Sequence, residues 1–367
     1  MTTAPINPEA LLVARESRGC TQEDVARAAG VTQGLISKVE KGIADLTAPE
    51  AVEGIARLLN YPVSAFYVPG RIREVGSACL YHRKRKTLPA KILRRLDARM
   101  YMRNVNVCNL FDGLDIEGDR VFQTLDIDEY GGSPAEVARA LRASWRLPDG
   151  PIPNLTALIE SAGGVVLRED FGHRKLFGMS CWTTRGHPLF FLNAEIPTAD
   201  LRWTMAHELA HLTMHHIAPS GDPEEEADEF AGEFLAPAAQ FRHDVRRLTF
   251  DRLPSLKSYW GLSMKGVIKR AAAIGAIDRN TAVRLYKQHS ARGYNTAEPY
   301  PLPDEPPTLV GAAIDVHIND HGYTPEEVAA ASRLLPEEFY PAFLGRPYPR
   351  TAGNVVSLFG RGGVPTA

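Results

Sequence analysis

Two histidines and a glutamate in the middle of the chain have the spacing of a hydrolytic metal site. Residues 204–211 read Thr-Met-Ala-His-Glu-Leu-Ala-His. In a helix, His207 and His211 lie one turn apart on the same face, so both rings can reach a single metal ion. Glu208 can then take a proton from a water molecule bound to that metal. The alternative is a core helix whose histidines are satisfied by hydrogen bonds.

A third ligand is expected downstream, because a catalytic zinc usually keeps three protein ligands and one open position. Residues 222–237 predict a second helix, with an Asp-Pro start and a proline after its end. Glu224 is the preferred third ligand and Glu226 the fallback. Asp228, four residues after Glu224, would orient a ligand histidine. Alternatively, this acidic run is only a solvated helix face.

Together the two segments resemble the ImmA/IrrE family of metallopeptidases. The matching patterns are His-Glu-Leu-Ala-His and Glu-x-x-Ala-Asp-x-Phe-Ala-x-x-Phe-Leu-x-Pro, and the resemblance covers about residues 141–248. That family is zinc-dependent and has the gluzincin arrangement of two histidines and a downstream glutamate. The resemblance therefore implies Zn²⁺ as cofactor, His207, His211 and Glu224 as its ligands, and Glu208 as the general base. Many members carry Asn at the position of Asp228, and either side chain can accept a hydrogen bond.

The N-terminal part carries a second pattern of a different kind. Residues 20–42 predict a helix, a tight turn at a glycine and a second helix, each helix preceded by a threonine N-cap. Amphipathic helices are expected on either side, at residues 9–18 and 48–59. Over about residues 6–68 this pattern closely resembles the XRE, or lambdoid-repressor, helix-turn-helix family. In that family the second helix of the motif enters the major groove of DNA.

The same resemblance indicates which residues would contact DNA. They are Thr32, Gln33, Gly34, Ser37 and Lys38 on the second helix, and Gln22, which would approach a phosphate. Gln33 suits adenine and Lys38 suits guanine, so both could read base sequence. The alternative is a helical bundle whose polar residues are only solvated. Residues 1–70 contain six Lys/Arg and eight Asp/Glu, so this domain is not basic by itself.

Positive charge is concentrated immediately after this domain. Residues 71–103 contain eleven Lys/Arg and two Asp/Glu, including the run Arg83, Lys84, Arg85 and Lys86. Such a run can neutralise DNA phosphates without reading sequence. It is equally well explained as a solvated linker followed by a helix that starts near residue 89. We expect that helix, over about 89–114, to connect the domains, with dimerisation as a further possible role.

The 367 residues predict a multidomain α+β chain of ordinary globular composition. The chain is expected to begin with an all-α helix-turn-helix domain (1–70), followed by a basic linker with the connecting helix (71–132). A gluzincin-like metallopeptidase domain with a small sheet and the His-Glu-x-x-His helix comes next (133–250). A helical subdomain (251–298) and a Pro-rich linker with a small helical unit and a loose tail (299–367) complete the chain. The subdomain at 251–298 is expected to close the peptidase domain, although it also reads as a second helix-turn-helix.

Cysteine usage and hydropathy indicate a cytoplasmic protein. The four cysteines, at 20, 79, 108 and 181, have no paired short spacing, which argues against a cysteine zinc site or a disulfide framework. No apolar signal segment and no run of about eighteen apolar residues is present, so no membrane partner is expected.

Three functions are compatible with these patterns. The first is a transcriptional regulator with an active zinc peptidase domain that cleaves a repressor-type protein, or itself, in response to a signal. The second is an antitoxin or autorepressor of a toxin–antitoxin or mobile-element module, in which the peptidase-like domain only binds or senses. The third is a regulator with a structural or sensory zinc site. Glu208 favours retained hydrolysis. The expected partners are a double-stranded DNA operator, a protein substrate or partner (repressor or toxin) and a second copy of the chain.

Overall fold

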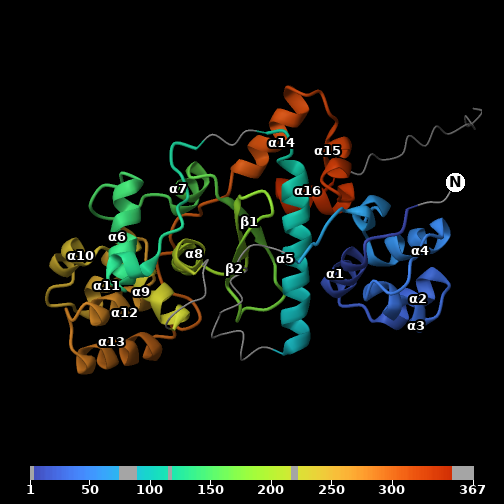
Figure 1. Ribbon diagram of the computed structural model, residues 1–367. Coiled ribbons are helices and arrows are strands. Elements are labelled where there is room, and N and C mark those ends of the chain that lie inside the picture. Colours follow the sequence, from blue (N-terminus) through green and yellow to red (C-terminus); the bar gives the residue numbers. More distant parts are fainter. Residues whose placement is uncertain (1–3, 74–88, 115–117, 216–221, 349–367) are drawn as a thin grey trace, which may run out of the picture.

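The computed structural model describes residues 4–73, 89–114, 118–215 and 222–348. The first of these ranges folds into an all-helical domain (Figure 1). Its core is closed by fully buried Leu11, Ile36, Ile55 and Phe66. The elements are α1 (Pro8–Arg18), α2 (Gln22–Ala29), α3 (Gln33–Glu40), α4 (Pro49–Leu59) and the 3-10 helix η1 (Val63–Tyr67).

Local capping residues determine where α2 and α3 begin and where α2 ends. Thr21 and Asp24 form a reciprocal capping box at the start of α2. Gly30 ends α2 with φ at +66°, a left-handed conformation that favours glycine. The hydroxyl of Thr32 then accepts a hydrogen bond from the Leu35 N–H and starts α3. The helix–turn–helix expected from the sequence therefore forms where it was predicted.

The long helix α5 (Ala90–Leu110) stands between the first helical domain and the sheet (Figure 1). Its residues Ala98 and Met102 belong to the same buried cluster as α1. Leu96 and Met100, on another face, belong to the cluster that covers the sheet. Both faces of α5 are therefore used within one chain, which leaves little of this helix for the dimerisation role considered from the sequence.

A three-stranded sheet with the order β1-β3-β2 lies in the described part of the chain. The strands are β1 (Val165–Glu169), β2 (Gly178–Trp182) and β3 (Pro188–Asn193); β1 is parallel and β2 antiparallel to β3. Side chains alternate between the two faces of β3. Phe190 points to the buried cluster that contains Met205, and Phe191 to the cluster shared with α5.

Helices on one face of the sheet form a single core with it. The central helix α8 packs on β2, β3 and α9. Residues after position 250, such as Trp260 and Leu285, are buried in the same cluster as Met205 of α8, so the helices at 251–298 are continuous with the preceding ones. The helices on this side are α6 (Pro134–Ser144), α7 (Leu155–Ser161), α8 (Thr198–Met214), α9 (Pro223–Leu235), α10 (Ala238–Asp244), α11 (Leu253–Trp260), α12 (Met264–Ala273) and α13 (Arg279–Ala291), with the 3-10 helices η3 (Ile127–Tyr130) and η4 (Phe250–Arg252).

The proline-rich segment 299–307 is anchored by carboxylates at its borders. Glu298 contacts the Lys257 ammonium at 3.1 Å. Glu305, which is buried, pairs with Arg202 of α8. The segment then leads to α14 (Leu309–Asn319), α15 (Pro325–Ala331) and α16 (Pro336–Leu344), which pack in the cluster on the α5 side of the sheet. The small C-terminal helical unit expected from the sequence is thus present.

Several sequence expectations fall outside the described residues. They are the basic run Arg83, Lys84, Arg85 and Lys86, and the tail at 349–367. The cysteines within the described ranges, at 20, 108 and 181, are free thiols. No helix in those ranges combines the length and apolarity needed to cross a membrane.

Candidate metal centre and DNA-binding face

Helix α8, which carries the candidate site, lies close against strand β2 of the sheet. A Cβ atom on Gly178 of β2 would lie only 2.7 Å from the Thr204 methyl group and 2.8 Å from Leu192. Glycine at this position therefore allows the strand to lie against the helix. The contact fixes the turn of α8 that contains His207, Glu208 and His211.

Helix α9 brings the third candidate ligand to α8. The Asp222 side chain caps α9 by accepting hydrogen bonds from the N–H groups of Glu224 and Glu225, and Pro223 occupies the first turn. Further along, Phe230 and Phe234 stack on each other and are fully buried. This anchoring turns the first turn of α9, with Glu224, toward the two histidines of α8.

The three side chains form a cluster with the dimensions of a tetrahedral metal site. The Nε2 atoms of His207 and His211 are 3.2 Å apart. A Glu224 oxygen lies 3.7 Å from His207 Nε2, and its other oxygen lies 3.5 Å from His211 Nε2. Ligands at about 2.1 Å from zinc stand about 3.4 Å from each other. The donor set of two imidazoles and a carboxylate therefore fits zinc in both chemistry and spacing.

The fallback ligand Glu226 lies behind this cluster rather than in it. Its carboxylate is 2.8 Å from His215 Nε2, and His215 Nδ1 is 2.7 Å from His211 Nδ1. Burial, together with the nearby His211, lowers the pKa of His215 to about 4, so its ring is neutral at pH 7. Glu226 and His215 thus hold His211 from its far side, which leaves His211 Nε2 directed at Glu224.

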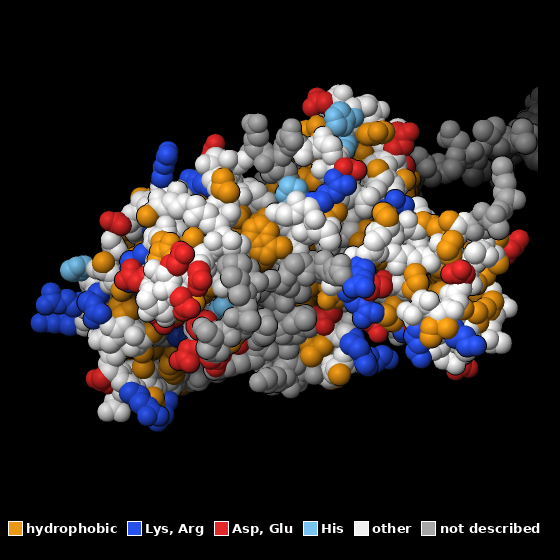
Figure 2. Space-filling model, viewed as in Figure 1, with side chains coloured by type: hydrophobic (Ala, Val, Ile, Leu, Met, Phe, Trp, Pro, Cys, Tyr) orange, Lys and Arg blue, Asp and Glu red, His pale blue; other side chains and the backbone are white. Residues whose placement is uncertain are grey.

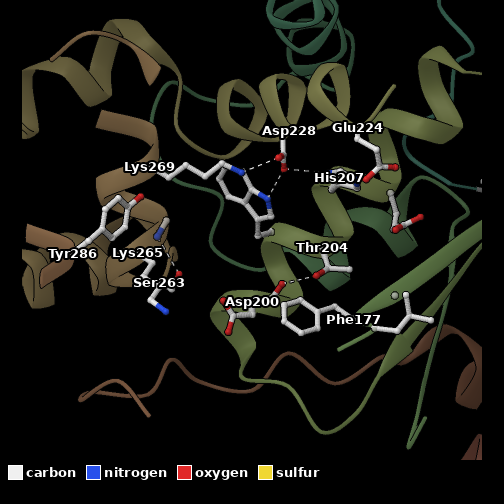
Figure 3. Close-up of a pocket in the computed structure, with 15 residues that line it drawn as sticks. Phe177, Asp200, Thr204, His207, Glu224, Asp228, Ser263, Lys265, Lys269 and Tyr286 are labelled. Carbon is white, nitrogen blue, oxygen red and sulfur yellow. Dashed lines mark hydrogen bonds and ion pairs between the residues drawn. The ribbon is translucent and has the colours of Figure 1, made fainter. Parts of the chain in front are cut away.

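Asp228 lies beside His207 and joins it to two further residues (Figure 3). Its Oδ1 is 3.3 Å from His207 Nδ1 and accepts a hydrogen bond from Trp203 Nε1, while its Oδ2 contacts Lys269 at 2.8 Å. Burial raises the pKa of Asp228, but His207 and Lys269 outweigh it and the pKa falls below its usual range. Burial likewise lowers the pKa of His207, yet Asp228 and Glu224 raise it to about 9.

The Glu208 carboxylate is fully buried and is oriented by the sheet. Ser180 of β2 donates its hydroxyl to Glu208 Oε2 at 2.7 Å. Glu208 also lines the cavity that reaches the metal ligands. The general base proposed from the sequence therefore lies next to the ligand cluster, and its position is set by a strand residue that sequence reasoning missed.

A cavity of about 470 Å³ opens onto this cluster (Figure 3). Phe177, Trp203 and Tyr286 contribute aromatic surface to its walls. Lys265 and Lys269 add positive charge from α12. Of these residues, Trp203 was detectable from the sequence, because it precedes His207 by four positions and shares its helix face. Lys269 and Tyr286 arrive from distant helices and had no local signal.

The predicted DNA-contacting residues lie at one end of the first domain. Thr32, Gln33, Gly34 and Lys38 are exposed, whereas Gln22 and Ser37 are half-buried. Gln33 donates its side-chain amide to Gln22 at 2.7 Å, and Gln22 donates to Glu40 at 2.8 Å. The two glutamines are therefore brought together, and Gln22 holds the amide of Gln33 in place. On the face shown in Figure 2, charges of both signs are interspersed over this domain.

The fold and the two sites define a DNA-binding protein that carries a peptidase-family domain. Residues 12–66 match the family model described as Helix-turn-helix, and residues 159–272 match the model described as IrrE N-terminal-like domain. The chain is a fusion of an XRE-type helix-turn-helix domain and an ImmA/IrrE-type domain, as both resemblances predicted. Comparison with curated proteins and with solved structures gives no match.

Proposed function

We propose that this DNA-binding regulator uses its IrrE-type domain as a zinc peptidase, which cleaves a repressor-type protein or a copy of itself in response to a signal. The observation that carries the proposal is the position of Glu208. A structural zinc site needs no base, yet this buried carboxylate lines the cavity beside His207, His211 and Glu224. Such a base next to three ligands is the arrangement of catalytic zinc sites.

Each residue of the cluster would have a separate role in peptide hydrolysis. Zinc held by His207, His211 and Glu224 would supply a Lewis acid for the peptide carbonyl and a lowered pKa for a water molecule. Glu208 accepts the proton of the attacking water and passes it to the leaving amine. Ser180 keeps the Glu208 carboxylate in position through its hydrogen bond to Oε2.

A peptide substrate has a defined way to approach this site. Strand β2 lies at the edge of the described sheet, and Gly178, at its start, lines the cavity. An extended peptide that pairs with such an edge gains main-chain hydrogen bonds. Its side chains would then enter the cavity walled by Phe177, Trp203 and Tyr286. We propose that protein segments are recognised in extended form at this edge.

The first domain would deliver this activity to DNA. We propose that a homodimer binds a double-stranded operator, with Gln33 and Lys38 contacting base edges and Gln22 supporting Gln33. Exposed Thr32, Gly34 and half-buried Ser37 complete the surface. The basic run at 83–86 would add contacts to phosphates.

The test compares wild-type protein with Glu208→Gln, measuring zinc content and intact mass over time, alone and with an added helix-turn-helix repressor. Glu225→Gln is the matched control, because Glu225 is exposed on α9 and is outside the cluster. We expect cleavage by wild type and by the control, and none by Glu208→Gln, with equal zinc in all three. Cleavage that survives in Glu208→Gln would disprove the assignment of the base. Full zinc without any cleavage would favour the alternative function, an antitoxin or autorepressor whose peptidase-like domain only binds.

A further inference from the structure

A second cavity, of about 590 Å³, lies where four parts of the chain meet. Its walls come from the DNA-binding domain, α5, the end of β1 and α16. It shares no lining residue with the cavity at the metal cluster. Five arginines line it: Arg18, Arg95, Arg99, Arg103 and Arg168.

Three of these arginines form a stripe along α5. Arg95, Arg99 and Arg103 follow each other at intervals of four residues, which places them on one face of the helix. Like charges at this spacing repel each other weakly, and anions that lie opposite them offset this repulsion. The stripe therefore concentrates positive charge on one face of α5.

The chain supplies two partly buried carboxylates for three of the guanidinium groups. Glu169 pairs with Arg99 at 2.6 Å and also with Arg103. Glu338 pairs with Arg103 at 2.9 Å and also with Arg18 of the DNA-binding domain. Burial raises the pKa of both carboxyl groups, but the arginines outweigh it, so both stay ionised at neutral pH.

The remaining two arginines have no buried anion. Arg95 is exposed and makes no ion pair with any described residue, and Arg168 contacts only the exposed Asp304, at 2.6 Å. Of the other acids that line the cavity, Asp170 accepts a hydrogen bond from the Gly172 N–H, and Glu337 is exposed. Among the described residues Arg95 therefore has no paired anion at the cavity wall, and the anion that pairs with Arg168 is exposed and does not line the cavity.

We propose that this cavity binds a small organic dianion, bearing a phosphate or two carboxylate groups, through Arg95, Arg99 and Arg168. Guanidinium groups suit this ligand because their planar donors match the oxygens of phosphate and carboxylate. The ligand would lie in the same cavity as the Arg18–Glu338 ion pair, which joins the DNA-binding domain to α16, so its binding would act at the junction of these two parts. This effector site does not depend on the peptidase proposal.

The test titrates the full-length protein with inorganic phosphate and, separately, with succinate, by calorimetry at constant ionic strength set with chloride. We expect saturable binding of one anion per chain by at least one of the two. Binding should be about tenfold weaker in Arg95→Gln, the loss expected for one charge-assisted contact. Arg94→Gln is the matched control, because Arg94 is the neighbouring exposed arginine of α5 and does not line the cavity.

The outcomes distinguish a phosphorylated ligand from a dicarboxylate, and a specific site from an effect of total charge. Saturation by phosphate alone assigns a phosphorylated ligand, and saturation by succinate alone assigns a dicarboxylate. No saturation by either anion overturns the proposal. Equal weakening in Arg94→Gln and Arg95→Gln also overturns it, because binding would then follow total charge. Arg168→Gln gives an independent check from β1 and must weaken binding as well.

Discussion

The predicted DNA-binding face and the candidate metal centre are built in opposite ways. The face on α2 and α3 is formed by six predicted contact residues between positions 22 and 38, four of them exposed, and it is set by caps within the same two helices. The candidate metal centre combines α8, α9, β2 and α12, and the side chains of its candidate ligands are largely removed from water. Its parts are held by contacts between residues far apart in the sequence.

This difference determines how each site responds to amino-acid substitutions. An exposed face loses only the contact that a substitution removes, because its helices do not depend on that side chain. A buried cluster depends on partners that orient one another, so loss of one member leaves others without a partner. We therefore expect substitutions in the two regions to act independently, and to differ in size.

The largest effect is expected at a ligand. His211→Ala removes the most deeply buried ligand side chain, which has no exposed surface in the structure. Zinc content and peptide cleavage should both be lost, while DNA binding stays unchanged. Metal analysis and an electrophoretic mobility assay on the same preparation measure both. A parallel loss of DNA affinity would show that the two regions are not independent.

The next effect is expected on the DNA-binding face. Gln33→Ala removes a side chain that is held by Gln22 and directed outward. Affinity for an operator selected from random duplexes by the wild-type protein should fall about 10- to 100-fold, the range for one bidentate base contact. Glu53→Gln, at an exposed position of α4, is the control. Unchanged affinity in Gln33→Ala would mean that another part of the chain reads the bases.

A smaller effect is expected at Asp228, which contacts the candidate ligand His207. Asp228→Asn keeps an acceptor for Trp203 and His207 but removes the charge that pairs with Lys269. Zinc affinity should fall about tenfold, which is typical for a partner of a ligand histidine. Competition with a chromogenic chelator measures this. Glu229→Gln, exposed on the same helix, should match wild type.

The smallest effect concerns the junction of the two regions. Glu338→Gln removes the anion shared by Arg18 and Arg103 and should lower the free energy of unfolding by about 1 kcal/mol at pH 7. Because the pKa of Glu338 is lowered in the folded state, this contribution is present above its unfolded pKa and is lost as pH falls through the folded value. The stability difference between variant and wild type, measured by denaturant unfolding, should therefore shrink below about pH 4. A difference that stays constant with pH would contradict the ionised pairs.

Sequence reasoning reached the features that are encoded locally. The helix–turn–helix follows from two threonine caps and Gly30, and these act within a few residues of one another. The candidate ligand pair His207 and His211 follows from helical spacing, and Glu224 was chosen from the expected acidic helix together with the family resemblance. The overall order of a helical domain, a small sheet with helices and a helical end was predicted correctly for the same reason.

What sequence reasoning missed is the surroundings of the site. Ser180 comes from a strand whose register could not be deduced, and Lys269 comes from a helix that packs against α9 only in the folded chain. The pairing of Glu226 with His215 shows the same limit, since Glu226 was considered as a ligand but its contact with His215 was not foreseen. Nor did composition reveal that the proline-rich segment is anchored through Glu305.

The packing of α1 on α5 changes what a cut in this chain would achieve. The backbone between Arg73 and Pro89 is the covalent connection between the first domain and the rest. The domain is also held by the buried contacts of α1 with α5 and by the Arg18–Glu338 pair. A nicked protein would therefore remain one particle until these non-covalent contacts were released. Severing the chain and freeing the DNA-binding domain are thus two separate events, each of which can be timed and controlled on its own.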